Sequence, residues 1–232
     1  MNLVILPCSS RPAPPPLAAR DVHVWSVPLG MPPANQEELL ALLTAEEQAR
    51  ANRYRAGRVR EQFITGRGCL RRLLGEYLGL PPQDVPIGYE LSGKPRLLGE
   101  DLRFNLTHTE DLALIAIAPR RVGVDLERVR EVPNAAGLVE RFFSTSECEA
   151  YRRLNPELRQ EAFFRGWTCK EAVIKAAGAS IESLQSFDVD LDPIRPPTVL
   201  GSRHATIGEC RWSLTTWTPA PRFTAAVAVE EV

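Results

Sequence analysis

Two acidic side chains, Asp125 and Glu127, stand two residues apart in the segment VGVDLER. If this segment is a β-strand, as its apolar start indicates, residues at positions i and i+2 point to the same face. Two carboxylates on one face repel each other unless a cation lies between them. Mg²⁺ binds carboxylate oxygens and leaves positions for water or a substrate phosphate. The pattern therefore predicts a magnesium site, although a solvent-facing pair of acids at a strand end has the same spacing.

A further acidic residue, Glu171, lies four residues before Lys175 in the segment FFRGWTCKEAVIKAAG. Such a pair is usually a surface ion pair that stabilises a helix by roughly 0.2–0.5 kcal/mol. On a helical wheel, however, Glu171 lies between Trp167 and Phe164, inside the apolar face. A carboxylate among aromatic side chains needs a charged partner, and a shared metal ion would supply one. Lys170 falls near the same face, so the wheel alone does not single out Glu171.

Five further polar residues could bind a ligand that is rich in phosphate groups. Lys94 lies in the tight turn GKP, and Thr107 and His108 place a hydroxyl and an imidazole side by side at the end of a predicted strand. Arg50 and Arg53 lie on a predicted helix. Each of them taken alone is typical of a solvated or structural side chain. Together they offer several cationic groups to phosphate oxygens.

The elements that carry these side chains are predicted from hydrophobic periodicity and from glycine and proline positions. Capping boxes are expected at Thr44–Glu47 and at Ser144–Glu147. The predicted helices cover residues 36–43, 44–55, 62–80, 138–143, 146–154 and 158–177. The predicted strands cover residues 21–27, 85–91, 104–107, 112–118, 122–126, 187–191, 211–217 and 223–229.

This order of elements predicts an α+β fold with two halves of similar size. The expected division is a proline-rich, poorly packed lead-in over residues 1–20, an N-terminal α+β half over 21–119, and a C-terminal α+β half over 120–232 that carries the acidic residues. No internal identity is strong enough to identify a sequence repeat. The apolar start of the chain has no basic residues before it, so no signal peptide is expected.

The composition argues against several kinds of function. The 232 residues include 28 basic and 29 acidic side chains, and a net charge of -1 does not favour a nucleic-acid partner. The five cysteines form no C-x-x-C pair, which argues against a disulfide scaffold or a zinc cluster and fits a reducing cytoplasm. Cys169 is expected to be an ordinary helical residue, because no activating partner is evident. No apolar run is long enough for a membrane span.

Five motifs follow one another in a fixed order: GKPRL, FNLTHT, VGVDLERV, RFF and W-x-x-KEA-x-x-K-x-x-G. Taken together, they resemble the signature of the surfactin-type (Sfp-like) 4'-phosphopantetheinyl transferases, over about residues 40 to 191 and more loosely over the whole chain. GVDLE together with WTCKEAVIKAAG is specific, whereas GKP alone is not. The resemblance implies a monomer in which two similar α+β halves form an intramolecular pseudo-dimer, with coenzyme A in the cleft between them.

The resemblance also implies roles for individual residues. Asp125, Glu127 and Glu171 match the magnesium ligands of the family, and Lys175 matches a lysine near the pyrophosphate. The residues that match contacts to the phosphates of coenzyme A, including the 3'-phosphate, are Arg50, Lys94, Thr107 and His108.

The sequence departs from the family pattern at a few positions. Thr107 replaces the usual serine but keeps a hydroxyl, and Arg50 stands where some members have lysine. After the last motif, the segment GASI replaces the more common G-x-G-L, which affects the expectation for the following loop rather than for the metal site.

The activity that the resemblance implies is transfer of 4'-phosphopantetheine from coenzyme A to a serine of an apo acyl or peptidyl carrier protein, with release of 3',5'-adenosine bisphosphate. Glu171 is the candidate base, and Lys175 would stabilise the leaving phosphate. The alternative is a non-catalytic module of the same fold that binds coenzyme A or a carrier. A magnesium nucleotidase would need a P-loop motif, which does not occur. We expect a cytoplasmic monomer with neither nucleic acid nor membrane as a partner.

Overall fold

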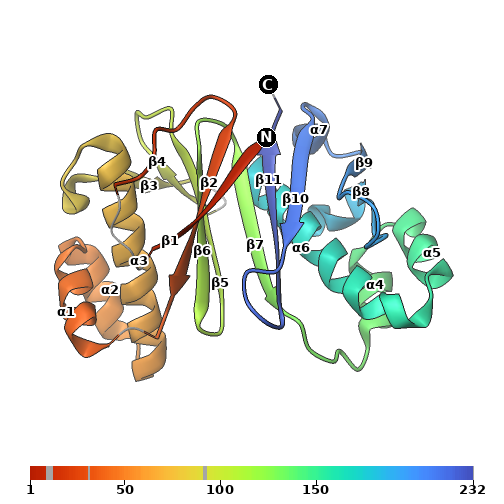
Figure 1. Ribbon diagram of the computed structural model, residues 1–232, viewed down its shortest axis with the longest axis horizontal. Coiled ribbons are helices and arrows are strands. Elements are labelled where there is room, and N and C mark those ends of the chain that lie inside the picture. The colour runs from red at the N-terminus through yellow and green to blue at the C-terminus, as the bar shows by residue number, and fades with distance from the viewer. Residues whose placement is uncertain (9–12, 31, 91–92, 232) are drawn as a thin grey trace.

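The computed structural model describes residues 1–8, 13–30, 32–90 and 93–231. Two β-sheets stand side by side in the middle of the molecule, and helices cover the outer side of each (Figure 1). The architecture is a mixed α+β fold, as the sequence predicts. Within the described ranges, no helix combines the length and the apolar character that crossing a membrane requires.

The N-terminal half places helices on one side of a four-stranded sheet. Its elements are β1 (Asn2–Pro7), β2 (Asp21–Pro28), α1 (Pro33–Ala41), α2 (Ala45–Arg53), α3 (Gly57–Leu78), the 3-10 turn η1 (Pro82–Asp84), β3 (Ile87–Tyr89), β4 (Pro95–Leu97), β5 (Arg103–Thr109) and β6 (Leu112–Ala118). The sheet order is β1-β2-β6-β5, and β6 pairs antiparallel with both β2 and β5. β3 and β4 form a separate hairpin, and the predicted strand 85–91 extends at Leu91 beyond the described residues.

The C-terminal half repeats this arrangement with a three-stranded sheet. Its elements are β7 (Val122–Arg128), α4 (Ala135–Phe142), α5 (Thr145–Arg153), η2 (Pro156–Leu158), α6 (Arg159–Ala177), η3 (Ile181–Ser186), β8 (Phe187–Val189), β9 (Val199–Ser202), α7 (Ala205–Gly208), β10 (Trp212–Trp217) and β11 (Phe223–Glu230). The sheet order is β10-β11-β7, and β11 pairs antiparallel with both neighbours. From β2 to β6 and from β7 to β11, a strand, three helices, a small strand pair and a closing strand pair follow one another, and the C-terminal half has the additional short helix α7 before its closing pair.

Short-range signals in the sequence account for most helix boundaries. Both predicted capping boxes form, with Thr44 at the start of α2 and Ser144 at the start of α5. Gly79 and Gly178 end α3 and α6 in the left-handed conformation, which glycine adopts without a steric penalty. α3 begins at residue 57, five residues before the predicted start.

A buried ion pair stands at the same place in each half. Glu47 Oε2 accepts a hydrogen bond of 2.5 Å from Arg71 Nε, between α2 and α3. Glu147 Oε2 accepts one of 2.7 Å from Lys170 Nζ, between α5 and α6. Each glutamate is the third residue of its helix and closes the capping box, so it holds its own helix start and also binds the helix on which its cationic partner lies.

The strand β1 was not expected from the sequence, which predicted a poorly packed lead-in over residues 1–20. β1 pairs parallel with β2 and forms the edge of the N-terminal sheet, with Asn2 opposite Asp21 and Pro7 opposite Ser26. Residues 13–18 lie in neither helix nor strand, in agreement with the prediction. The strand was missed because a parallel partner some 19 residues away leaves no local signal in the sequence.

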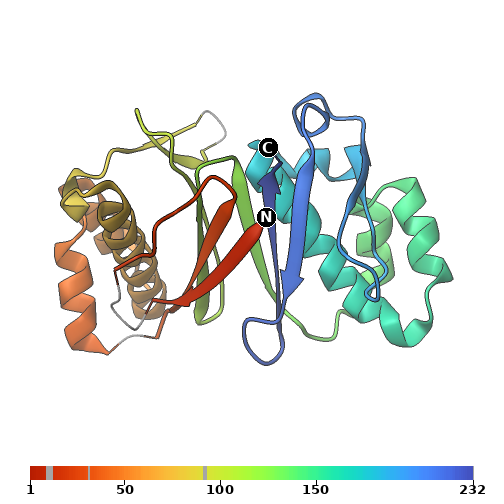
Figure 2. The same cartoon turned by 45° about the horizontal axis from the view of Figure 1, so that its top comes forward.

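The two sheets pack against each other through an apolar seam. β6 and β11 alternate along their lengths, so one face of each contributes to the seam and the other packs under the helices. The seam contains Val24, Leu114, Val124 and Val227, all with no exposed surface. In both views, β7 and β11 lie between the N-terminal sheet and α6 (Figure 1 and Figure 2). A functional site near the seam can therefore contain residues from both halves.

Candidate functional site

The carboxylate of Asp125 is the centre of a polar cluster at the seam. Asp125 lies on β7 and is 4% exposed. Its Oδ1 accepts a hydrogen bond of 2.5 Å from Lys175 Nζ on α6 and one of 3.3 Å from Thr107 Oγ1 on β5. Its Oδ2 is buried and has no hydrogen-bond partner. One oxygen is therefore fully engaged, and the other is available to a cation or a donor.

A close contact between β7 and α6 brings the predicted acidic residues together. Strand alternation turns Gly123, Asp125 and Glu127 toward α6. A Cβ atom on Gly123 would lie 2.1 Å from the Ala172 carbonyl oxygen and 2.4 Å from the Ala176 nitrogen. Only glycine allows this approach, and the approach places the end of α6 within reach of Asp125. The segment VGVDLE thus contains both a candidate metal ligand, Asp125, and the glycine that lets α6 approach it.

Burial and the charge of Asp125 raise the pKa of both neighbouring glutamates. Burial and the nearby charge of Asp125 raise the pKa of Glu127 to about 7. Burial also raises the pKa of Glu171, while the ammonium of Lys175 opposes that shift. Lys175 Nζ lies 4.0 Å from Glu171 Oε2, and the Glu171 side chain is 15% exposed. Crowded, desolvated carboxylates of this kind are stabilised by a cation.

The donor set agrees in chemistry with a magnesium ion, which prefers carboxylate oxygens. The buried and unpartnered Oδ2 of Asp125 and the raised pKa of Glu127 are what a cation would relieve. Within the described part of the chain, however, no three His, Cys, Asp or Glu side chains form a ready-made metal cage. Mg²⁺ is commonly held by one or two carboxylates together with waters and substrate phosphates, so these residues fit the ion. A set of three protein ligands remains a prediction.

Two contacts tie the N-terminal half to the site: a buried one from Asn105, which the sequence did not single out, and a partly buried one from Lys94, which was predicted at phosphate groups instead. Asn105 Oδ1 on β5 accepts a hydrogen bond of 2.8 Å from the backbone nitrogen of Val124, directly before Asp125. Lys94 Nζ, on the β3–β4 hairpin, donates to the backbone oxygen of Lys175. That carbonyl is one of the last four of α6, which have no partner within the helix. The sequence could have indicated Asn105, because it is a polar residue inside the predicted strand of FNLTHT and would need a hydrogen-bond partner there.

A pocket of about 410 Å³ opens on the N-terminal half. Arg50, Tyr54, Phe63, Tyr89 and His108 are among the residues that line it. The guanidinium of Arg50 lies 5.2 Å from the centre of the Phe63 ring. Burial and the nearby charge of Lys175 lower the pKa of His108. Aromatic rings with cations at their edges suit a ligand that joins a planar base to phosphates.

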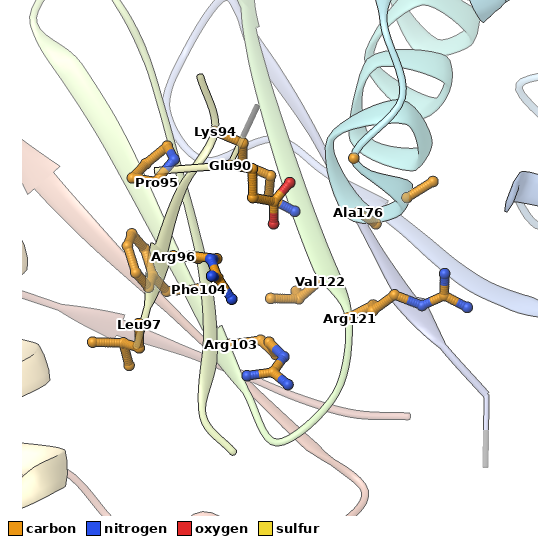
Figure 3. A pocket seen from close by; sticks show the side chains of 12 residues that line it. Glu90, Lys94, Pro95, Arg96, Leu97, Arg103, Phe104, Arg121, Val122 and Ala176 are labelled. Carbon is orange, nitrogen blue, oxygen red and sulfur yellow. The ribbon is translucent and has the colours of Figure 1, made fainter. Parts of the chain in front are cut away.

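The other three predicted phosphate contacts do not line this pocket, and Thr107 is engaged with Asp125 instead. Arg53 lines a neighbouring hollow of about 490 Å³, which shares Arg50 with the pocket. Lys94 lines a separate basic pocket of about 280 Å³ on the far side of the β3–β4 hairpin, where burial lowers its pKa. Figure 3 shows Arg96 and Arg103 on one side of that pocket and Arg121 on the other. The structure thus brings Arg50 and His108 together and separates Lys94 from them.

Cys169 shows none of the features of a nucleophile. It has no exposed surface, and burial raises the pKa of its thiol to about 12. A thiol that stays protonated at neutral pH does not attack a substrate. The prediction of an ordinary helical cysteine is confirmed.

We expect Asn105 to position Asp125. Asn105→Ala would leave the buried Val124 N–H without an acceptor and loosen β7 against β5, so kcat should fall by about ten- to a hundredfold. The KM for coenzyme A should change little, because no contact with the pocket is lost. Steady-state kinetics and thermal unfolding of Asn105→Ala and Asn105→Asp, which keeps an acceptor oxygen, provide the test. A lowered Tm with an unchanged kcat in Asn105→Ala would show that the bond is only structural.

Comparison with known proteins identifies the class to which this fold and site belong. Residues 121–228 match the profile of the 4'-phosphopantetheinyl transferase superfamily, and residues 32–120 match that of the 4'-phosphopantetheinyl transferase N-terminal region. The 4'-phosphopantetheinyl transferase HetI of Nostoc sp. is 40% identical over 94% of this chain and 92% of its own length. The 4'-phosphopantetheinyl transferase of Bacillus subtilis is 26% identical over 67% of this chain and 70% of its own length.

The chain therefore belongs to the 4'-phosphopantetheinyl transferase superfamily, and the predicted transferase class is confirmed. Among solved structures, the holo-[acyl-carrier-protein] synthase of Thermotoga maritima matches with a TM-score of 0.38 and 24% identity, over 47% of this chain and 62% of its own.

Proposed function

We propose that this protein transfers the 4'-phosphopantetheine group of coenzyme A to a serine hydroxyl of an apo acyl or peptidyl carrier protein and releases 3',5'-adenosine bisphosphate. The observation that carries the proposal is the arrangement around Asp125. A buried carboxylate with one unpartnered oxygen accepts hydrogen bonds from an ammonium and a hydroxyl, and the N-terminal half carries an aromatic pocket with cationic residues in its lining. A non-catalytic binding module would not require this arrangement.

The chain's own residues supply a base and a group that stabilises the leaving phosphate. The serine oxygen attacks the β-phosphorus of coenzyme A, a new P–O bond forms, and the bond from that phosphorus to the bridging oxygen breaks. Glu171 accepts the serine proton. Its raised pKa suits this role, because a base is most effective when its pKa approaches the working pH. Lys175 stands beside Asp125 and stabilises the negative charge on the departing 3',5'-adenosine bisphosphate.

Asp125, Glu127 and Glu171 are the residues that would hold a magnesium ion. When bound, that ion neutralises the charge that develops on the pyrophosphate during transfer. Thr107 supports this arrangement from the opposite half through its hydrogen bond to Asp125.

We assign this pocket on the N-terminal half to the adenosine and 3'-phosphate end of coenzyme A. Its aromatic residues offer flat faces to the base, and Arg50 and His108 offer donors to phosphate oxygens. Arg53, in the adjoining hollow, adds a further cation at the entrance. Lys94 acts here mainly through its bond to the Lys175 carbonyl, and it joins the hairpin that borders the pocket to α6.

We expect Arg50→Ala and His108→Ala each to raise the KM for coenzyme A by about tenfold, the value of one charge-assisted hydrogen bond. The increase should be much smaller with 3'-dephospho-coenzyme A, because that donor has already lost the group these residues contact. Arg58→Ala removes a cation from an ion pair that is 66% exposed on both sides and serves as the control. An equal rise in KM for coenzyme A and for 3'-dephospho-coenzyme A would show that Arg50 and His108 do not contact the 3'-phosphate.

We further propose that the chain is of the surfactin type, a monomer whose halves, residues 21–119 and 120–232, form an intramolecular pseudo-dimer. Support comes from the shared order of elements, from β6 and β11 as the central strands of the two sheets, and from the matching capping-box ion pairs. A cytoplasmic location is supported by the five cysteines, none of which forms a disulfide. Sedimentation of the purified protein tests the monomer.

A further inference from the structure

Two cysteines outside the transferase site face each other across the N-terminal half. Cys8 follows the edge strand β1, and Cys69 lies in α3. Arg72, one helical turn beyond Cys69, donates from Nη2 to both sulfur atoms, at 3.3 Å from Cys8 Sγ and 3.7 Å from Cys69 Sγ. The two thiols therefore share one guanidinium, although 61 residues separate them in the sequence.

The environment of the pair shifts the pKa values of the two thiols in opposite directions. A hydrogen bond from the Cys69 thiol, followed by the bond from Arg72, lowers the pKa of Cys8 to about 6. The same contact with Cys8, together with burial, raises the pKa of Cys69. These contacts favour the ionised form at Cys8 and the protonated form at Cys69. A thiolate beside a second cysteine is the arrangement of a redox-active pair, in which one sulfur attacks and the other resolves.

The remaining cysteines have the opposite character. Burial raises the pKa of the thiols of Cys148, Cys169 and Cys210, and for Cys169 the value reaches about 12. Cys8 is therefore the reactive cysteine of this chain. It is 5% exposed and directly follows the edge strand β1.

We propose that Cys8 and Cys69 are a redox-active dithiol that a hydroperoxide oxidises to a disulfide joining β1 to α3. The Cys8 thiolate attacks one peroxide oxygen, the O–O bond breaks, and a sulfenic acid forms as hydroxide leaves. The Cys69 sulfur then attacks the sulfenic sulfur and loses its proton, and the hydroxyl leaves as water. Two electrons pass from the two sulfurs to the peroxide. The guanidinium of Arg72 holds the attacking sulfur ionised and in place.

The disulfide would change the stability of the N-terminal half. β1 is an edge strand with one partner, and the cross-link would fix its end to the central helix α3. Closing a loop of this length in the unfolded chain should raise Tm by roughly 5 °C or more. This inference does not depend on the transferase reaction, and its readouts require no carrier protein.

The test is peptide mapping of the full-length reduced protein after hydrogen peroxide and alkylation under non-reducing conditions. The expected product is a single cross-linked peptide containing Cys8 and Cys69, which dithiothreitol separates, and a raised Tm before reduction. Cys8→Ser and Cys69→Ser should each abolish the cross-link. Cys148→Ser, at a position that is 7% exposed, is the matched control and should leave it unchanged. Over-oxidised Cys8 beside an alkylated Cys69 would overturn the proposal, as would cross-links through other cysteines.

A second measurement uses the unmodified protein and so does not depend on the folding of a variant. The rate at which iodoacetamide alkylates Cys8, followed by mass spectrometry against pH, should rise with a midpoint near pH 6. Arg72→Met should move the midpoint upward. A midpoint in the ordinary range of a cysteine, about 8.5, would contradict the ionised sulfur on which the mechanism rests.

Discussion

Asp125→Ala is expected to abolish phosphopantetheine transfer while the protein stays folded. Among the described residues, Asp125 supplies a buried carboxylate oxygen without a hydrogen-bond partner, and its other oxygen accepts hydrogen bonds from both Lys175 and Thr107. Its removal takes away the charge that a cation requires and releases the lysine from its position. We expect a loss of roughly a thousandfold or more in kcat, the order of magnitude that preorganised charge contributes to such reactions.

Single-turnover transfer to an apo carrier, measured with and without a chelator of divalent ions, checks this expectation. Asp125→Asn keeps the shape and an oxygen for Thr107 but loses the charge, so it should resemble the alanine variant in rate and exceed it in Tm. Chelation should abolish the wild-type activity and have no further effect on either variant. A wild-type rate in Asp125→Asn would show that transfer does not require a metal ion at Asp125.

Glu171→Gln is expected to lower kcat by about a hundredfold, the usual loss for one base or metal ligand. The Tm should stay the same or rise, because burial and the neighbouring Asp125 penalise the charge of Glu171. A surface ion pair would behave differently, with a loss of at most about 0.5 kcal/mol in stability and no change in rate. Lys175→Ala should lower kcat with little effect on the affinity for coenzyme A, because its ammonium acts on the leaving group.

The chain contains a matched control for this experiment. Glu149 and Arg153 also stand four residues apart on a helix, at 3.0 Å, but their side chains are 54% and 77% exposed. Glu149→Gln should leave kcat and Tm close to wild type. Equal and small effects of Glu171→Gln and Glu149→Gln would show that Glu171 is a surface residue and that Asp125 and Glu127 hold the metal without it.

Features that depend on short-range sequence were predicted well. The capping boxes at Thr44 and Ser144 and the glycine that ends α6 act within one or two turns, and the apolar strand β6 begins and ends at its predicted residues. The two acids of VGVDLER lie on one strand, two residues apart, as predicted, because strand alternation is a local property.

Features that depend on pairing between distant segments were not predicted. β1 is fixed by β2, and the role of Asn105 requires β7 to lie against β5. The helical wheel placed Lys170 and Glu171 near the same face and could not distinguish them. The packing distinguishes them. Lys170 has no exposed surface and donates to Glu147, whereas Glu171 lies beside Lys175 and Asp125.

The most direct test of the central claim is intact-mass spectrometry of a panel of apo acyl and peptidyl carriers incubated with this protein, coenzyme A and magnesium. The account predicts that at least one carrier gains the mass of a single phosphopantetheine group on its serine, with release of 3',5'-adenosine bisphosphate in equal amount. A Ser→Ala carrier and the Asp125→Ala enzyme should show no gain. If the folded protein binds coenzyme A in a calorimeter and yet no carrier gains mass, the protein is a binding module and the catalytic assignment is wrong.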